Sequence, residues 1–152
     1  MGYVEVKANY VEDFESWKEE FNFFAPLTVR FSDIDMYGIV NNAVTISYME
    51  FARIEYLKEI ELMDEWLHPE GEKIPVVADV QCDYLKPITY NEKLEIYVKS
   101  NVVNNSSVDL HYMAKNEKAE IVFVGRGTLV QINRKTGKGF AWSEKEKSLF
   151  VG

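Results

Sequence analysis

The sequence has little of the chemistry that builds disulfides or metal centres, since it holds one cysteine and two histidines in 152 residues. Cys82 cannot form an internal disulfide, and its place in an apolar strand pattern favours a small buried side chain over a nucleophile. His68 and His111 lie far apart without ligand-like neighbours. Neither a metal site nor a histidine-based triad is therefore expected.

Basic side chains are also few, with 17 Lys and Arg against 25 Asp and Glu and a formal net charge of −8. Binding to a phosphate backbone needs a net basic surface, so this balance disfavours nucleic acid as a partner. No apolar run reaches membrane-spanning length, and the first residues lack the basic and apolar regions of a secretion signal. We therefore expect a cytoplasmic protein that does not bind a membrane.

The composition that is present, 47% hydrophobic and 28% charged, is that of an ordinary globular domain. Residues 1–22 are predicted to be an N-terminal extension of a domain that spans residues 23–152. Phe14, Trp17 and Phe21 recur in the extension at helical spacing among glutamates. This pattern predicts a short amphipathic helix whose aromatic stripe covers part of the core.

Alternation of apolar and polar residues predicts about five strands in the domain. The first has one face formed by Ala25, Leu27, Val29 and Phe31, and the others cover about residues 76–84, 94–102, 108–114 and 121–132. The faces predicted for the third and fourth strands are Leu94, Ile96, Val98 and Val102, and Val108, Leu110, Tyr112 and Ala114. Glycines 125 and 127 in the last strand indicate a bulge or a close approach. Valines at 122 and 124 face away from Phe123, which favours a subunit contact and a homodimer.

One long helix is predicted from Ala43 to about Glu61, and it is apolar around most of its circumference. Glu50 and Arg53 are its only charges through Ile54, and their spacing allows them to pair. A helix of this kind is enclosed by other structure. The predicted fold is α+β, with a curved antiparallel sheet wrapped around one central helix.

The turn between the first strand and this helix reads Arg30-Phe31-Ser32-Asp33-Ile34-Asp35-Met36-Tyr37-Gly38-Ile39-Val40-Asn41-Asn42. Gly38 permits unusual backbone dihedrals or the close approach of a ligand. Asn41 and Asn42 are preferred helix N-cap types, so free backbone N–H groups should point back at the turn. Asp, Asn and Gly are also ordinary turn residues, but a carboxylate beside amide donors is a candidate site.

This string, followed by Tyr48, Glu50, Ala52 and Arg53, closely resembles the acyl-CoA thioesterase family with the hotdog fold, and within it the 4-hydroxybenzoyl-CoA-thioesterase-like branch. The resemblance covers about residues 24–150. It implies hydrolysis of an acyl-CoA to free acid and CoA, without a cofactor, by a homodimer or homotetramer. By position, Asp35 matches the catalytic carboxylate, as general base or nucleophile, and Asn42 matches the residue whose backbone N–H polarises the thioester carbonyl. The motif positions implied to contact substrate are Tyr37, Gly38, Val40, Asn41 and Thr45.

Several alternatives stay open at this point. Asp33 is assigned to structure, as a turn-forming side chain or a partner of Arg30. Glu50 is a rival carboxylate because some hotdog thioesterases carry theirs on the central helix. Members of the family often have His at the position of Asn42 and Tyr at that of Thr45, so acyl preference is not carried over. A non-catalytic module that binds acyl-CoA, or a thioesterase acting on acyl carrier protein, fits the same fold. Candidates to bind the CoA nucleotide are Lys86, Arg134 and Lys135.

Overall fold

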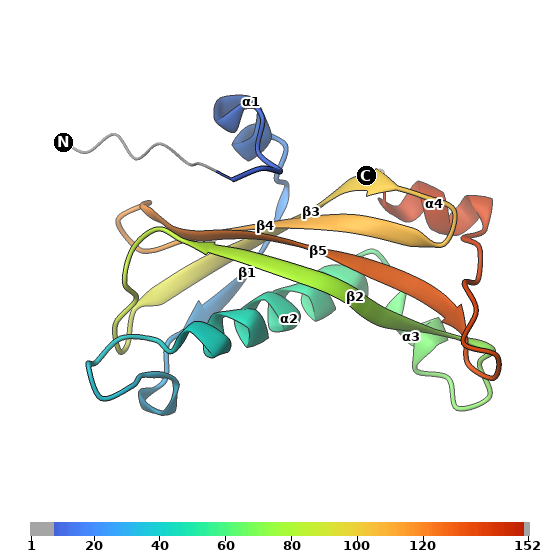
Figure 1. Ribbon diagram of the computed structural model, residues 1–152, viewed down its shortest axis with the longest axis horizontal. Helices are drawn as coiled ribbons and strands as arrows, with labels where there is room; N and C mark the ends of the chain where they lie inside the picture. Colours follow the sequence, from blue (N-terminus) through green and yellow to red (C-terminus); the bar gives the residue numbers. More distant parts are fainter. Residues whose placement is uncertain (1–7, 151–152) are drawn as a thin grey trace.

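The computed structural model describes residues 8–150, which form one antiparallel sheet with a long helix on one of its faces (Figure 1). The strand order in the sheet is β1-β3-β4-β5-β2. The strands are β1 (Phe23–Thr28), β2 (Lys73–Tyr84), β3 (Lys93–Val103), β4 (Ser107–Lys115) and β5 (Ile121–Asn133). The helices are α1 (Phe14–Glu19), α2 (Asn42–Glu59), α3 (Met63–Trp66) and α4 (Glu144–Phe150).

The main core lies between α2 and the inner face of the sheet. The alternation predicted for the third and fourth strands is confirmed, and the core includes Leu94, Ile96, Val98, Val108, Leu110, Tyr112 and Ala114. Helix α2 contributes Tyr48, Met49, Ala52, Tyr56 and Leu57. Each large apolar side chain buried here contributes roughly 1.5–3 kcal/mol, so the contact of α2 with the sheet is the main source of stability.

Gly125 on β5 lies directly against Met49 of α2. A Cβ atom at this position would lie 2.7 Å from the Met49 methyl carbon and 2.9 Å from the Gln81 carbonyl oxygen. The close approach predicted for the glycines of this strand is therefore confirmed, because a side chain here would collide with both the helix and β2.

The outer face of the sheet is covered by the segment that carries α1 (Figure 1). Val11, Trp17 and Phe21 form a second buried cluster with Met113 and Val124. The predicted aromatic stripe thus packs on the sheet, while residues 1–7 of the predicted extension lie outside the described residues. Because Val122 and Val124 are buried within the single chain, the inference of a subunit contact from these valines is wrong.

Three expectations about individual faces are also wrong. Phe31 is 73% exposed because β1 ends at Thr28 and Phe31 begins a short 3-10 helix, η1 (Phe31–Asp33). Val102 is 49% exposed because the pairing of β3 with β4 shifts register between Ser100 and Val102. Phe51 is 40% exposed, since the sheet covers α2 on one side only and leaves the other side of the helix open.

Strand β2 is an edge of the sheet and pairs with β5 alone among the described residues. Val76, Val77 and Val80 on this strand are exposed. An open edge with apolar side chains is a surface on which another strand can pair. Between residues 8 and 150, no helix is long and apolar enough to cross a membrane.

Candidate functional site

The turn before α2 is held by the carboxylate of Asp33, which is 4% exposed. Asp33 accepts hydrogen bonds from the Arg30 backbone N–H at 3.0 Å, the Arg30 guanidinium at 3.1 Å and the Tyr48 hydroxyl at 2.8 Å. Burial alone would raise the pKa of Asp33, but these donors outweigh it and lower that pKa. The predicted pairing of Asp33 with Arg30 is confirmed, and Asp33 anchors the turn to α2.

Asp35 follows in a tight turn and is half-buried. Its carboxylate accepts one hydrogen bond from the Tyr37 backbone N–H at 2.8 Å, through Oδ1. The Asp35 carbonyl accepts from Gly38 N–H at 3.0 Å, and Gly38 has a φ of +78° that favours glycine. Among the described residues no donor contacts the second carboxylate oxygen of Asp35, so that oxygen is free to act on a substrate or water.

The start of α2 is tied to this turn through Asn41, which precedes Asn42, the first residue of the helix. Asn41 N–H donates to the Asp33 carbonyl at 3.1 Å, and the Asn41 side chain caps the helix by accepting from Ala43 N–H at 2.8 Å. The backbone N–H of Asn42 has no hydrogen-bond partner within residues 8–150, and Asn42 is exposed. A helix N-terminus carries a partial positive charge, so this N–H is suited to stabilise an oxyanion.

The remaining positions of the motif divide between surface and core. Tyr37 is exposed beside Asp35, whereas Val40 is buried in the main core and donates its backbone N–H to the Ile88 carbonyl at 2.8 Å. Thr45 is buried one turn into α2. The structure thus brings Asp35, Tyr37 and Gly38 into one turn next to the asparagines, and turns the side chain of Val40 away from that surface.

Two residues of β2 that the sequence did not place at the site contact the first turn of α2. Tyr84, at the end of β2, donates from its hydroxyl to the Asn42 carbonyl at 2.7 Å. Cys82 lies 3.9 Å from the Thr45 hydroxyl, and its burial raises the pKa of the thiol, which argues against a nucleophilic role. The alternation of β2 put Cys82 and Tyr84 on one face, but nothing in the sequence indicated which helix that face meets.

The rival carboxylate Glu50 lies on the exposed side of α2. Within the described part of the chain Glu50 forms no ion pair with Arg53, so the predicted pairing is wrong. Glu50 therefore points away from both the sheet and the core, because it occupies the side of α2 opposite Met49 and Ala52.

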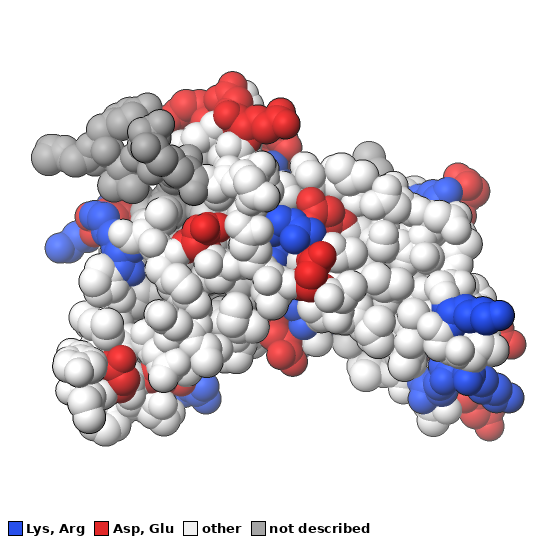
Figure 2. All heavy atoms as spheres, viewed as in Figure 1, with Lys and Arg blue, Asp and Glu red and all other residues white. Residues whose placement is uncertain are grey.

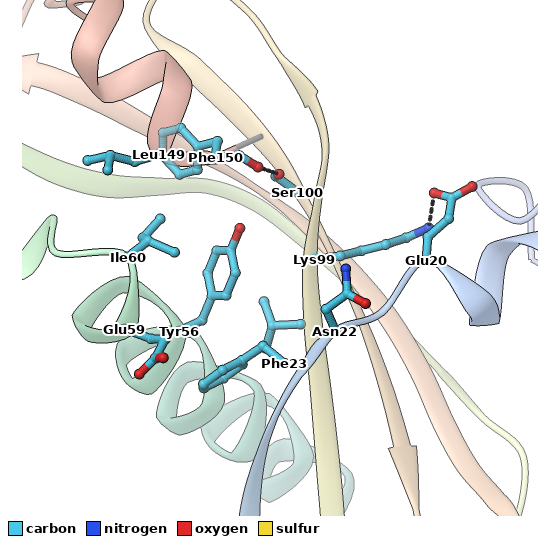
Figure 3. A pocket seen from close by; sticks show the side chains of 11 residues that line it. Glu20, Asn22, Phe23, Tyr56, Glu59, Ile60, Lys99, Ser100, Leu149 and Phe150 are labelled. Atoms are coloured by element: carbon cyan, nitrogen blue, oxygen red, sulfur yellow. Dashed lines mark hydrogen bonds and ion pairs between the residues drawn. The ribbon is translucent and has the colours of Figure 1, made fainter. Parts of the chain in front are cut away.

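A hollow of the single chain lies at the other end of α2 (Figure 3). It has a volume of about 390 Å³ and is walled by Phe23, Tyr56, Ile60 and Phe150, with Glu59 and Lys99 at its rim. Neither Asp35 nor Asn42 lines this hollow or the hollows beside α1, beside Val77 and beside Lys86. The candidate site lies on the surface of the single chain, where Tyr37 and Asn42 are exposed.

The three basic residues considered for CoA binding have different surroundings. Lys86 forms an ion pair with Glu120, and Arg134 donates to the Gly71 carbonyl at 3.0 Å. Arg134 and Lys135 follow β5, at the end of the molecule opposite the Asp35 turn (Figure 1), where Figure 2 shows a group of basic side chains. Only Lys86 of the three lies near the turn, because β2 ends beside the start of α2.

Comparisons of sequence and structure relate this chain to thioesterases. The family model of the thioesterase-like superfamily matches residues 29–148. The uncharacterized protein YsmA of Bacillus subtilis (strain 168) is 40% identical over 138 residues, which cover 91% of each chain. The chloroplastic acyl-acyl carrier protein thioesterase ATL3 of Arabidopsis thaliana is 26% identical over 112 residues, covering 72% of this chain and 57% of that protein.

Among solved structures, a thioesterase from Thermus thermophilus, crystallised with coenzyme A and Zn, is 32% identical and superposes with a TM-score of 0.72. The superposition covers 87% of this chain and 94% of that one. The long helix on a five-stranded antiparallel sheet is the hotdog fold that the sequence predicts. With the match over residues 29–148, the chain belongs to the thioesterase-like superfamily, in its hotdog-fold, 4-hydroxybenzoyl-CoA-thioesterase-like branch.

Proposed function

We propose that this protein hydrolyses an acyl-CoA thioester to a free acid and CoA, with Asp35 as the catalytic carboxylate. The observation that carries the proposal is the pairing of a half-buried carboxylate, with one oxygen free, and the unpartnered N–H of Asn42 at the start of α2. The hydrogen bond from the Asn41 N–H to the Asp33 carbonyl holds the two groups in one unit. The Thermus relative with bound coenzyme A supports CoA as the thiol half of the substrate.

The chemistry follows from those two groups. As the thioester carbonyl is attacked its oxygen gains negative charge, which the Asn42 N–H stabilises. Asp35 can take a proton from the attacking water, after which the C–S bond breaks and the CoA thiolate leaves and is protonated. Alternatively, the Asp35 carboxylate attacks first and gives a mixed anhydride that water then hydrolyses. Both routes use the same free oxygen.

A second copy of the chain completes the cleft in this proposal. The single chain offers an exposed surface beside Asp35, and hydrogen bonds to a developing oxyanion are stronger where bulk water is excluded. The open edge of β2, with exposed Val76, Val77 and Val80, is the surface that pairs in a homodimer. Sedimentation at micromolar concentration should give a dimer or a dimer of dimers. A stable monomer would contradict this arrangement.

The proposed activity is tested by release of free thiol from a panel of acyl-CoAs with aromatic, short and long acyl groups. Asp35→Asn should lower kcat by at least about 10²-fold, since it removes the only group that accepts the proton or attacks. The matched control is Asp64→Asn, an exposed carboxylate on α3, which should retain full activity. Equal turnover by wild type and Asp35→Asn would refute the assignment.

Acyl carrier protein is the second substrate carrier to test, because the Arabidopsis relative is named as acting on acyl-acyl carrier protein. The net charge of −8 opposes the docking of an acidic carrier, so we expect acyl-CoA to be the better substrate. If neither acyl-CoA nor acyl carrier protein is hydrolysed while acyl-CoA binds, the protein is a binding or sensing module.

A further inference from the structure

The first turn of α2 receives an unusual pair of hydroxyl groups. The Asn42 carbonyl accepts from the Thr45 hydroxyl at 2.7 Å and from the Tyr84 hydroxyl at 2.7 Å. In a regular helix this carbonyl needs only the backbone N–H four residues later. The hydroxyl of Thr45 comes from the same helix, so Tyr84 is the one donor that links the carbonyl to another element.

The Asn42 carbonyl is the nearer of two possible acceptors for the Tyr84 hydroxyl. The hydroxyl oxygens of Thr45 and Tyr84 are 3.2 Å apart, and Thr45 has one hydrogen to donate. When Thr45 donates that hydrogen to Tyr84, the hydrogen of Tyr84 is left for the Asn42 carbonyl, which at 2.7 Å is also a nearer acceptor than the Thr45 oxygen. The Cys82 thiol, two residues earlier on the same face of β2, approaches Thr45 at 3.9 Å. The end of β2 is thus fastened to the first turn of α2.

We propose that Tyr84 is a positioning residue for the thioesterase reaction, and that its hydroxyl fixes the direction of the Asn42 backbone N–H through the Asn42 carbonyl. This inference rests on the proposed function. The N–H and the carbonyl belong to the same residue, so fixing one constrains the φ and ψ that orient the other. Asn41 holds the next amide, Ala43 N–H, from the opposite side. Between them, the cap and Tyr84 leave the Asn42 N–H as the donor that faces outward.

The size of the effect follows from the geometry that catalysis requires. Losing an oxyanion donor altogether typically costs about 10²–10³ in kcat. Tyr84→Phe keeps the Asn42 N–H donor and the aromatic ring of residue 84 but removes the hydroxyl that aligns the donor. We therefore expect kcat to fall about tenfold. KM should stay within about twofold, because the donor gains strength as charge develops in the transition state.

The experiment compares wild type, Tyr84→Phe, Tyr97→Phe and Asp35→Asn on the acyl-CoA with the highest kcat/KM. Tyr97 is the matched control, since its hydroxyl bonds Glu95 at 3.2 Å on β3, away from α2. Amide hydrogen exchange of residues 43–46, followed by NMR, gives a readout that does not need activity. In Tyr84→Phe this exchange should be at least about threefold faster, and in Tyr97→Phe unchanged.

The outcomes distinguish failure of the role proposed for Tyr84 from failure of the proposed thioesterase function. If Asp35→Asn is inactive and Tyr84→Phe matches Tyr97→Phe in kcat, the positioning role is overturned and the function stands. A rise in KM at constant kcat makes Tyr84 a substrate contact and also overturns the inference. If Asp35→Asn is fully active, the assignment of Asp35 as the catalytic carboxylate fails, and if wild type itself releases no thiol, the proposed function fails. In that case only the amide exchange rates test the role of Tyr84. Unchanged rates in Tyr84→Phe would show that Tyr84 does not hold the first turn of α2.

Discussion

The buried carboxylate of Asp33 should be the most sensitive position in the turn that presents Asp35. The prediction concerns Asp33→Ala, which removes the acceptor for the Arg30 backbone N–H and for the Tyr48 hydroxyl. Tyr48 is 2% exposed, so its hydroxyl would be left buried without a partner. The Arg30 side chain is 73% exposed, and its ion pair with Asp33 adds little because water screens it.

The loss divides into two contributions. An unsatisfied buried hydroxyl costs about 1–3 kcal/mol. Losing a capping acceptor at the start of η1 costs about 1 kcal/mol. Asp33→Ala should therefore lower the free energy of unfolding by about 3 kcal/mol, which for a chain of this size lowers Tm by roughly 6–12 °C. Tyr48→Phe should cost less, about 1 kcal/mol, because Asp33 keeps the Arg30 donors.

Urea unfolding followed by tryptophan fluorescence measures both variants, with Asp64→Ala as the exposed control within about 0.5 kcal/mol of wild type. The pKa of Asp33 is lowered in the folded protein, so its contribution is present above its ordinary value of 3.8. The contribution is lost as the pH falls through the lowered pKa, and the gap between wild type and Asp33→Ala should close there. A loss under about 1 kcal/mol at neutral pH, or a larger loss in Tyr48→Phe, would refute this account.

Three further predictions concern the rest of the molecule. Burial lowers the pKa of His111 below its ordinary value of 6.5, despite nearby Asp109, so the unfolded chain gains the proton first as the pH falls. The free energy of unfolding should therefore drop below about pH 6.5. A pH series of urea unfolding should show no such drop in His111→Gln. Gly125→Ala should lower stability by about 1–3 kcal/mol, measured by thermal unfolding, because the new methyl meets the Gln81 carbonyl at 2.9 Å. Trp66→Phe removes the donor at 2.8 Å from the buried Gln131 side chain and should cost about 1–3 kcal/mol in the same assay; an unchanged Tm would show that another donor satisfies Gln131.

Much of the fold follows from local sequence. The periods of two and of 3.6 residues predicted five strands and a long helix, and apart from Val102 the inner faces of β3 and β4 were predicted correctly. The aromatic stripe at Phe14, Trp17 and Phe21 predicted a covering helix. These predictions are confirmed because burial selects the same residue type at each repeat of an element that packs on one side.

Local sequence also predicted part of the candidate site. The sequence alone determined the local contacts of the turn, because each of them joins residues a few positions apart. They are Asp33 bonded to Arg30, Gly38 in a left-handed conformation and Asn41 as the cap. Whether Asp35 and Asn42 catalyse thioester hydrolysis stays a prediction.

Only the tertiary structure decided which contacts join distant parts of the chain. It placed Tyr84 on the Asn42 carbonyl, buried Val124 under α1 and left Phe31 and Val102 in solvent. It also placed the hollow of about 390 Å³ at the end of α2 away from Asp35. The physical reason is that a strand pattern specifies which side chains share a face, whereas the partner of that face depends on register, bulges and packing between segments tens of residues apart.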